Sequence, residues 1–497
     1  MVQNMIKNIK QNLLKTFTIV FIITMFFLVW TAIFNNGSLF RELNIYVEII
    51  GAIGFIALLW LIYKILNRID ERYLWIIVSF SFITIIILQL FFIRYFRVNP
   101  SWDFDVIIGG AKAIANGDKY LWSYFYERYP NNSGITLVLA FIYSSVRKFT
   151  TNNDIYIYVG YLLNIIMVNL SVYVIYKFSK DEFGKRFSAL VSIFCIFVTP
   201  LYTYTTIVYT DTITAVFPIL EFYLLYKVLK TNSKKKWLYI SVLGALAAVG
   251  TILKTNILIS FIAIVIICIF LLRNIDLLKS LIILLASFSI VMVIGKGIIS
   301  ERFPIKYEDA GFPYTHWIMM GLKNQGGYDG YDVNFTSDIC KKQGKEAAER
   351  ANIEEIKNRL KNYGVKGYLN FLKEKISFTW GDGTYYAPNK LRRDPMNTNN
   401  MQEYVIGEKN QAYIYLSQFV HIVILIGITI SGVMSYKRYD VIKGIQICIF
   451  GVFLFLILWE TRSRYLVCYL PLMIFCAMDG FNSIFKSIES KIILNNS

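Results

Sequence analysis

Residues Leu74 to Phe92 read LWIIVSFSFITIIILQLFF, a stretch with no charged side chain. A helix needs roughly 20 predominantly apolar residues to cross the hydrocarbon core of a bilayer. Thr16 to Phe34 and Ile257 to Leu272 are runs of the same kind, and roughly a dozen such candidates follow one another along the chain. The sequence therefore predicts an all-α polytopic membrane protein with about 12 or 13 spans.

The composition agrees with that class. Hydrophobic residues make up 56% of the 497 positions and charged residues only 17%, although the formal net charge is +18. The basic residues gather in short loops between apolar runs, as the positive-inside rule requires, and no basic soluble domain is present to bind nucleic acid. Five of the six cysteines lie inside apolar runs, so no disulfide framework is indicated. The predicted partner is the lipid bilayer, not nucleic acid.

Basic loops orient the chain across the membrane. Three lysines precede the first apolar run, which places the N-terminus in the cytoplasm. Two further spans, at about 45–63 and 73–96, then bring the chain outside at Asp103 and Asp105.

A second count starts from the most basic loop, residues 234–236. If this loop is cytoplasmic, Asp211 and Lys254 lie on the same outer face as the first acidic pair. We therefore expect a multi-pass protein of the cell membrane with an extracellular active site.

The region between residues 131 and 211 complicates this count. It holds three apolar runs, near 134–146, 155–176 and 187–208, whereas the two ends require an even number of crossings. The first run is short, so we expect it to be re-entrant or interfacial.

The spans divide the chain into three regions. We expect an N-terminal transmembrane region over 1–299, with a catalytic external loop at about 97–133, a large extracellular loop over 300–410, and C-terminal transmembrane helices over 411–497. Loops longer than about 15 residues tend to be functional or disordered.

The large loop is expected to mix helices with irregular pieces. Lys345 to Lys361 and Tyr368 to Phe378 have helical, amphipathic patterns, and segments rich in glycine and asparagine flank them.

Ionisable residues gather at the outer boundary, where their cost in the membrane makes them informative. A carboxylate there can deprotonate a hydroxyl or hold a divalent cation such as Mg²⁺ or Mn²⁺, and cations can neutralise a departing phosphate. The candidates for catalysis are Asp103 and Asp105, and those for substrate binding are Glu127, Arg128, Asp211, Lys254, His316, Glu460, Arg462 and Arg464.

Several of these residues also have structural interpretations. Asp105 could cap the interfacial helix that follows it, so we favour Asp103 as the base and Asp105 as the cap. Glu127 and Arg128 could simply end a helix before Pro130. Lys254 could extend its ammonium to the membrane boundary.

Two later segments are equally open. The segment from Glu460 to Arg464 could be a charged hairpin tip, but two arginines in an external turn oppose the positive-inside trend and favour a function. His316 could be an acid, a base, an acceptor-binding group or a plain surface histidine. With two histidines in the chain, a His/Cys metal site is not indicated.

The order of these motifs resembles a known family. An acidic external loop precedes Tyr129-Pro130-Asn131-Asn132, and a late Arg464-Tyr465 leads to Pro471. This pattern resembles the GT-C fold, and within it the glycosyltransferase family 39-like group of protein O-mannosyltransferases and aminoarabinose transferases. Segments 315–321, 326–332 and 380–385 resemble envelope-glycosylating members from Gram-positive bacteria.

The resemblance implies that a sugar moves, with inversion, from a polyprenyl-phosphate donor to an envelope polymer or protein. It implies that Asp103 or Asp105 is the base, and that Lys254, Arg128 and the Arg462/Arg464 pair bind phosphate. The chain departs from the family in having two helices before the span that leads to the acidic loop, and Asp-x-Asp instead of adjacent carboxylates.

Two other functions remain open. A polysaccharide polymerase or ligase of the same fold would use the same donor and the same basic residues. A transporter or lipid-linked glycan flippase would instead need functional charges near the bilayer midplane and repeated halves. Glu48 and Glu221 are the few acidic residues within apolar runs.

Overall fold

The computed structural model describes residues 2–36, 42–119, 124–150, 152, 154–303 and 311–495. Every regular element in these ranges is a helix, and one isolated β-bridge pairs Val98 with Pro395. The prediction of an all-α polytopic membrane protein is therefore confirmed. Residues 120–123 and 304–310, which belong to the two external loops expected from the sequence, lie outside the described residues.

Ten helical segments of the described chain are long and apolar enough to cross a membrane. They contain α1 (Val2–Phe34), α2 (Ile45–Arg68), α3 (Leu74–Tyr95), α7 (Ile155–Phe183), α10 and α11 (Thr210–Ile213 and Val216–Lys230), α12 (Lys235–Leu253), α14 (Asn274–Arg302), α19 (Gln411–Met434), α20 (Val441–Leu458) and α21 (Leu470–Asn495). An eleventh candidate joins α8 (Lys185–Ile196) to the segment that begins with α9 (Pro200–Thr203), at a bend of 64°.

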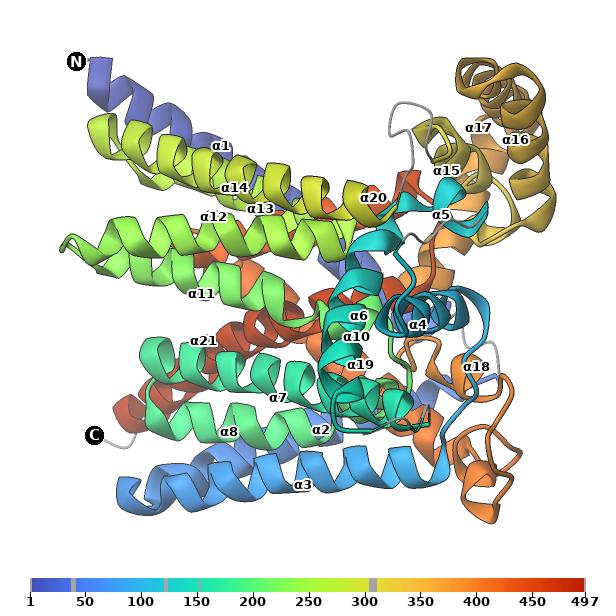
Figure 1. Ribbon diagram of the computed structural model, residues 1–497. Helices are drawn as coiled ribbons and strands as arrows, with labels where there is room; N and C mark the ends of the chain where they lie inside the picture. Colours follow the sequence, from blue (N-terminus) through green and yellow to red (C-terminus); the bar gives the residue numbers. More distant parts are fainter. Residues whose placement is uncertain are drawn as a thin grey trace.

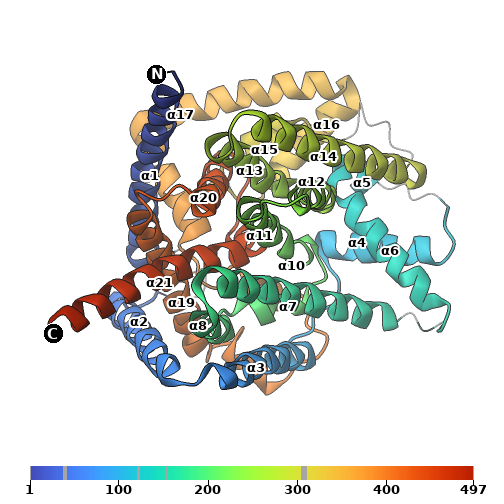
Figure 2. The same ribbon diagram turned by 90° about the vertical axis from the view of Figure 1, so that its left-hand side faces the viewer.

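Two short helices lie outside these ten or eleven candidates, against an expected 12 or 13 spans. One is α13 (Leu258–Leu271), an apolar helix that links α12 to α14 but is shorter than the others. The other is α6 (Ser133–Arg147), which lies across the end of the bundle instead of along it (Figures 1 and 2). The short run near 134–146 is therefore not among the candidate spans, as its length led us to expect, and α7 and the bent α8–α9 segment remain between residues 131 and 211.

The α6 helix packs against α4 (Trp102–Ala115), which also lies across the end of the bundle (Figure 2). Its buried side chains Ile135, Leu139 and Tyr143 recur every four residues and so share one face. The helices α4 and α6 thus cover one end of the bundle, and the first turn of α4 lies at this end.

The two ends of the bundle differ in what they carry. Both chain termini lie at one end, and the extramembrane helices lie at the other, which we call the loop-bearing end (Figure 1). These helices are α5 (Tyr124–Arg128), α15 (Tyr314–Met320), α16 (Gly330–Gln343), α17 (Lys345–Trp380) and α18 (Ala387–Leu391). The 3₁₀ helix η5 (Asn324–Gly326) joins α15 to α16, and η7 (Ser463–Tyr469) joins α20 to α21.

The two helices expected in the large loop are both present. They form the two halves of α17, which breaks at Gly364, where φ is 56° and ψ is −176°. This left-handed conformation suits glycine, because a Cβ would clash with the backbone there.

The centre of the bundle is the crossing of α19 and α21. A Cβ built on Gly480 would lie 2.1 Å from the carbonyl oxygen of Gly427, so only glycine allows this close approach. Nearby, Phe178 of α7 stacks on Phe475 of α21 with ring centroids 3.8 Å apart. This packing fixes α21, and with it the 460–464 segment just before it.

Candidate active site

Asp211 lies at the centre of an ion-pair cluster at the loop-bearing end. Nη1 of Arg464 lies 2.9 Å from Oδ2 of Asp211, and Nζ of Lys254 pairs with Oδ1. The carboxylate comes from α10, the lysine from the residue after α12 and the arginine from η7. All three side chains are almost completely buried, with 4%, 10% and 12% exposure for Asp211, Lys254 and Arg464. Two cations therefore share one carboxylate, which leaves the cluster with a net positive charge.

Asp103 adjoins this cluster through aromatic side chains. The hydroxyl of Tyr209 donates a hydrogen bond of 3.1 Å to Oδ2 of Asp103. The ring of Trp102 meets that of Tyr209 edge to face, with centroids 5.0 Å apart. The guanidinium of Arg464 lies 5.4 Å from the Trp102 ring and 5.6 Å from the Tyr209 ring. A half-buried carboxylate thus stands beside a buried cationic site.

The start of α4 corrects the role expected for Asp105. The N-cap of α4 is Ser101, in an extended conformation, and Asp105 lies in the first turn, where its side chain is exposed. Asp105 therefore does not cap the helix, although a carboxylate in a first turn interacts favourably with the helix dipole. Trp102, which opens the helix, has a φ of 51°, a costly conformation for a bulky residue.

Glu460 adds a second carboxyl group near Asp103. It is buried, and the hydroxyl of Tyr465 donates a hydrogen bond of 2.5 Å to its Oε2. Burial raises the pKa of Glu460, and the negative charge of Asp103 adds to this effect. The charges of Asp103 and Glu460 also raise the pKa of Tyr328, after the larger effect of burial. Glu460 is therefore a weaker acid than an exposed glutamate, and Asp103, which accepts the hydrogen bond from Tyr209, is the candidate base.

Lys390 was not among the site residues expected from the sequence. It comes from α18, and its Nζ lies 3.3 Å from the centre of the Trp102 ring. Burial lowers its pKa to about 6, and the positive charges of Arg464 and Arg393 contribute. A lysine in a polar loop is not distinctive in a sequence. The aromatic and proline residues that precede Lys390 were the sequence feature that could have drawn attention to it. Lys390 is the third cation to reach the cluster.

Asp382 fixes the segment that carries Arg464. Its Oδ2 accepts hydrogen bonds from the hydroxyl of Ser463 at 2.7 Å and from the backbone N–H of Tyr386 at 2.9 Å. Its Oδ1 accepts from both the N–H and the hydroxyl of Thr384. Asp382 thus joins the end of the large loop to the residue beside Arg464.

Arg462 faces a different environment from Arg464. Its guanidinium lies 4.6 Å from the rings of both Phe378 and Tyr386. A Cβ on Gly327 would lie 3.4 Å from its Nη2. The expected arginine pair is therefore split: the backbone of Arg462 is extended, whereas Arg464 lies in η7, where the chain turns.

Glu127, Arg128 and His316 do not join the cluster. Glu127 is exposed, and Nη2 of Arg128 donates to the hydroxyl of Ser337 in α16 at 2.9 Å. His316 is completely buried, and its Nδ1 lies 2.8 Å from the hydroxyl of Thr336. Burial lowers the pKa of His316 to about 4, and Arg128 contributes to this shift. Of the alternatives left open for His316, the plain surface histidine is therefore excluded, because α15 turns the ring into the core of the loop helices.

The carboxylates of the described residues show no grouping that fits a metal ion. Among the described residues, no group of three or more histidine, cysteine, aspartate or glutamate side chains could hold a metal ion. Asp103 and Asp105 also differ in burial, and only Asp103 contacts Tyr209. The Mg²⁺ or Mn²⁺ ion considered from the sequence therefore has no fitting ligand set here, and no step below uses one.

Fold and site together define a multi-pass integral membrane protein with buried charges at its loop-bearing end. The profile of a family described as conserved hypothetical integral membrane protein matches residues 5–483, and the chain belongs to this family.

Comparison with curated proteins gives no match. Among solved structures, the chain is similar to the archaeal oligosaccharyltransferase AglB from Archaeoglobus fulgidus in complex with an inhibitory peptide and a dolichol-phosphate. The identity is 12% and the TM-score 0.43, over 85% of this chain and 52% of that one. The chain therefore spans about half the length of this structure.

Proposed function

We propose that the protein is a membrane glycosyltransferase that moves a sugar from a polyprenyl-phosphate donor to a hydroxyl group of a cell-envelope acceptor. One observation carries this proposal: Asp103 stands beside a buried cluster in which Arg464 and Lys254 share Asp211. A carboxylate suits the acceptor hydroxyl, and a cationic site suits the phosphate.

The proposed reaction is a single displacement. Asp103 takes the proton of the acceptor hydroxyl, and the oxygen attacks the anomeric carbon of the sugar. The bond between that carbon and the phosphate oxygen breaks, and the lipid phosphate leaves with the electron pair. Because attack and departure occur on opposite faces, the anomeric configuration inverts.

Arg464, Lys254 and Lys390 neutralise the leaving phosphate in this mechanism. Asp211 holds the first two cations in place before the donor arrives, which removes the cost of ordering them during the reaction. Lys390 has a pKa of about 6, so its amine is mostly neutral near pH 7 until an anion binds beside it.

The finer class we propose is the GT-C fold, in the family 39-like group that modifies Gram-positive envelopes. The Arg464-Tyr465 pair that suggested it supports the proposal, because Arg464 binds Asp211 and Tyr465 binds Glu460.

We also propose an extracellular site in the cell membrane with a cytoplasmic N-terminus. The basic loop at 234–236, between α11 and α12, supports this orientation, because it lies at the end of the bundle that carries the termini (Figure 1).

The test replaces Asp103 in a strain that lacks the native copy. Asp103→Asn keeps the shape and the hydrogen bond from Tyr209 but removes the base, so we expect the envelope sugar to fall at least 100-fold. Asp105→Asn is the matched control, since Asp105 lies in the same turn but is exposed. Sugar analysis of the envelope, at equal protein level, gives the readout. Full modification with Asp103→Asn would contradict the assignment.

A polymerase or ligase would use the same site. Polymer length in a deletion strain separates the two: loss of a polymerase leaves single repeat units, whereas loss of a decorating enzyme leaves full-length polymer without side sugars.

Glu221 favours a second candidate, a transporter or flippase. Glu221 is completely buried in α11, Ser260 donates a hydrogen bond of 2.5 Å to its Oε2, and its Oε1 has no partner among the described residues. A buried carboxyl group within a span is typical of proton relays. If the protein is a transferase, Glu221→Gln should change the envelope sugar less than twofold. A loss as large as that of Asp103→Asn would favour transport.

A further inference from the structure

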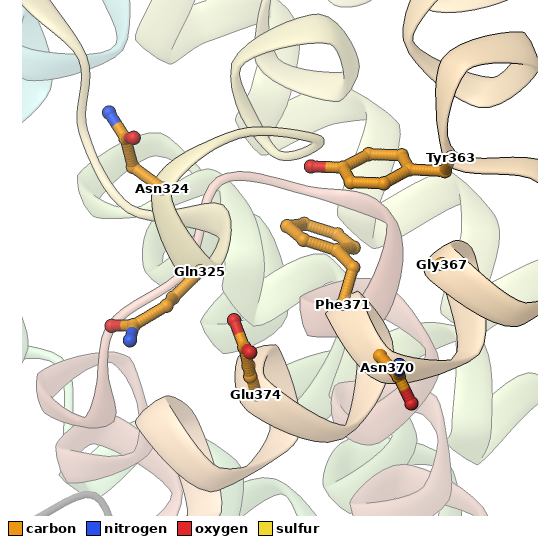
Figure 3. Close-up of a pocket in the computed structure, with 7 residues that line it drawn as sticks. All are labelled: Asn324, Gln325, Tyr363, Gly367, Asn370, Phe371 and Glu374. Carbon is orange, nitrogen blue, oxygen red and sulfur yellow. The ribbon is translucent and has the colours of Figure 1, made fainter.

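A groove of about 600 Å³ lies between η5 and the second half of α17, outside the ion-pair cluster (Figure 3). Its lining includes Asn324, Gln325, Tyr363, Asn370, Phe371 and Glu374. None of these residues has a part in the proposed transfer of the sugar.

The lining combines an aromatic surface with planar polar groups. The rings of Tyr363 and Phe371 stack with centroids 5.1 Å apart and an angle of 28° (Figure 3). Around them stand three side-chain amides and one carboxylate. Amides both donate and accept hydrogen bonds, and a carboxylate accepts them. The lining contains no cation and no aliphatic side chain, so it suits neither a phosphate nor an acyl chain.

A sugar ring has the complementary chemistry. Its C–H face packs on an aromatic ring, and its hydroxyls pair with amides and carboxylates. We propose that this groove binds the carbohydrate part of the acceptor, a neutral oligosaccharide. This inference rests on the proposed function in that it gives the transferase a glycan as acceptor.

The η5 wall of the groove is held in an uncommon conformation. Asn324 and Gln325 have φ angles of 49° and 59°, and Gly326 follows with 79°. Buried Lys375 supports this turn: its Nζ donates a hydrogen bond of 2.6 Å to the carbonyl of Gly321. A Cβ on Gly326 would lie 2.5 Å from Cε of Lys375, so a larger residue would displace this lysine, and the φ of 79° also favours glycine. The wall is therefore ordered before a ligand binds, which lowers the cost of binding.

The same turn touches the segment that carries the cluster. The backbone N–H of Thr461 donates a hydrogen bond of 2.7 Å to the carbonyl of Gly326. Thr461 follows Glu460, and its hydroxyl lies 2.8 Å from that of Thr379 in α17. One short segment thus joins the groove to the residues that we propose for phosphate and proton transfer.

The test measures binding without any donor. Full-length protein in lipid nanodiscs is mixed with maltotriose or chitotriose, and saturation-transfer difference NMR reports the contact. We expect transfer to the sugar protons in the wild type, and at least a threefold loss in the Gln325→Ala/Asn370→Ala double variant. Both residues are exposed, so the variant should fold. The control is Gln343→Ala/Asn358→Ala, which removes two exposed amides outside the groove.

Three outcomes would overturn the inference. They are no transfer to either trisaccharide, equal transfer in the groove and control variants, and transfer only to a serine- and threonine-rich peptide tested in parallel, which would make the groove a protein site. The Asp103→Asn variant should bind the trisaccharide like the wild type. If it binds normally while its envelope is fully modified, the proposed function fails and the groove stands; if binding fails while the envelope depends on Asp103, only the groove is wrong.

Discussion

Two aspartates at opposite ends of the bundle have the same kinds of partners. Asp211 binds Lys254 and Arg464 at the loop-bearing end, and Asp181 binds Lys177 and Lys227 at the end with the termini. The two ion-pair clusters differ in how deeply their cations are buried. The cations of Asp181 are 37% and 28% exposed, whereas those of Asp211 are 10% and 12% exposed.

The neighbours of the two aspartates differ as well. Tyr223 donates to Asp181, and with Lys227 it ties α11 to α7. Around Asp211 stand the rings of Trp102 and Tyr209, with Lys390 beyond them. Charges exert stronger forces in a low-dielectric surrounding. The same kinds of ion pair therefore join helices where water screens them and form a buried cluster of charges where it does not.

The largest expected effect comes from removing the central carboxylates. Asp211→Asn leaves two buried cations without a counter-ion, which should cost about 3–5 kcal/mol of stability and abolish transfer. Asp181→Asn removes a more exposed carboxylate and should cost about 1 kcal/mol or less. Thermal unfolding in detergent, followed by size-exclusion chromatography, measures both. Equal losses would show that burial does not separate the two sites.

A smaller effect is expected when a cation keeps its charge but changes shape. Arg464→Lys retains the charge but loses the planar fork that reaches Asp211, so transfer should fall roughly 10- to 100-fold. The matched change at the other end, Lys227→Arg, should leave transfer within twofold. Initial rates of sugar transfer in membranes give the comparison, and unchanged activity in Arg464→Lys would argue against a phosphate at this position.

The effect at neutral pH is smallest for Lys390, where we expect a pH dependence that only the buried cluster should show. Lys390 has a pKa of about 6 without a donor, so its amine is mostly neutral above this pH. If the donor phosphate binds the charged amine, Lys390 must take up a proton when the donor binds. Donor affinity should therefore be highest at or below pH 6 and weaken as the pH rises, by up to about tenfold per unit. The KM for the donor from pH 5.5 to 8 tests this expectation. Lys390→Arg, which stays charged, should give a flat profile, and a flat profile in the wild type would contradict the role.

The helices were largely predictable, because an apolar run such as Leu74 to Phe92 must satisfy its backbone hydrogen bonds internally in a bilayer, and a helix does so. The break in α17 at Gly364 agrees with the two helices expected in the large loop. The number of spans was less predictable, because apolar content alone does not decide whether a short helix such as α13 counts as a span.

The candidate site was predictable only in part. Asp103, Asp211, Lys254 and Arg464 were chosen from the sequence because charges at a membrane boundary are costly, and the structure brings them together. Asp105 was assigned as the cap because the sequence alone does not show that the helix begins directly after Ser101. Lys390 was missed because what places it at the site is its contact with the ring of Trp102, which is far away in the chain.

The sequence by itself determined the class of protein and the loops that carry charge, since hydropathy and the positive-inside rule act over neighbouring residues. Only the tertiary structure decided which charges meet. Asp211 and Arg464 are 253 positions apart, and their pairing depends on how α10 and η7 pack at the loop-bearing end. An ion pair needs atoms within a few ångströms, a condition that no local pattern in a sequence encodes.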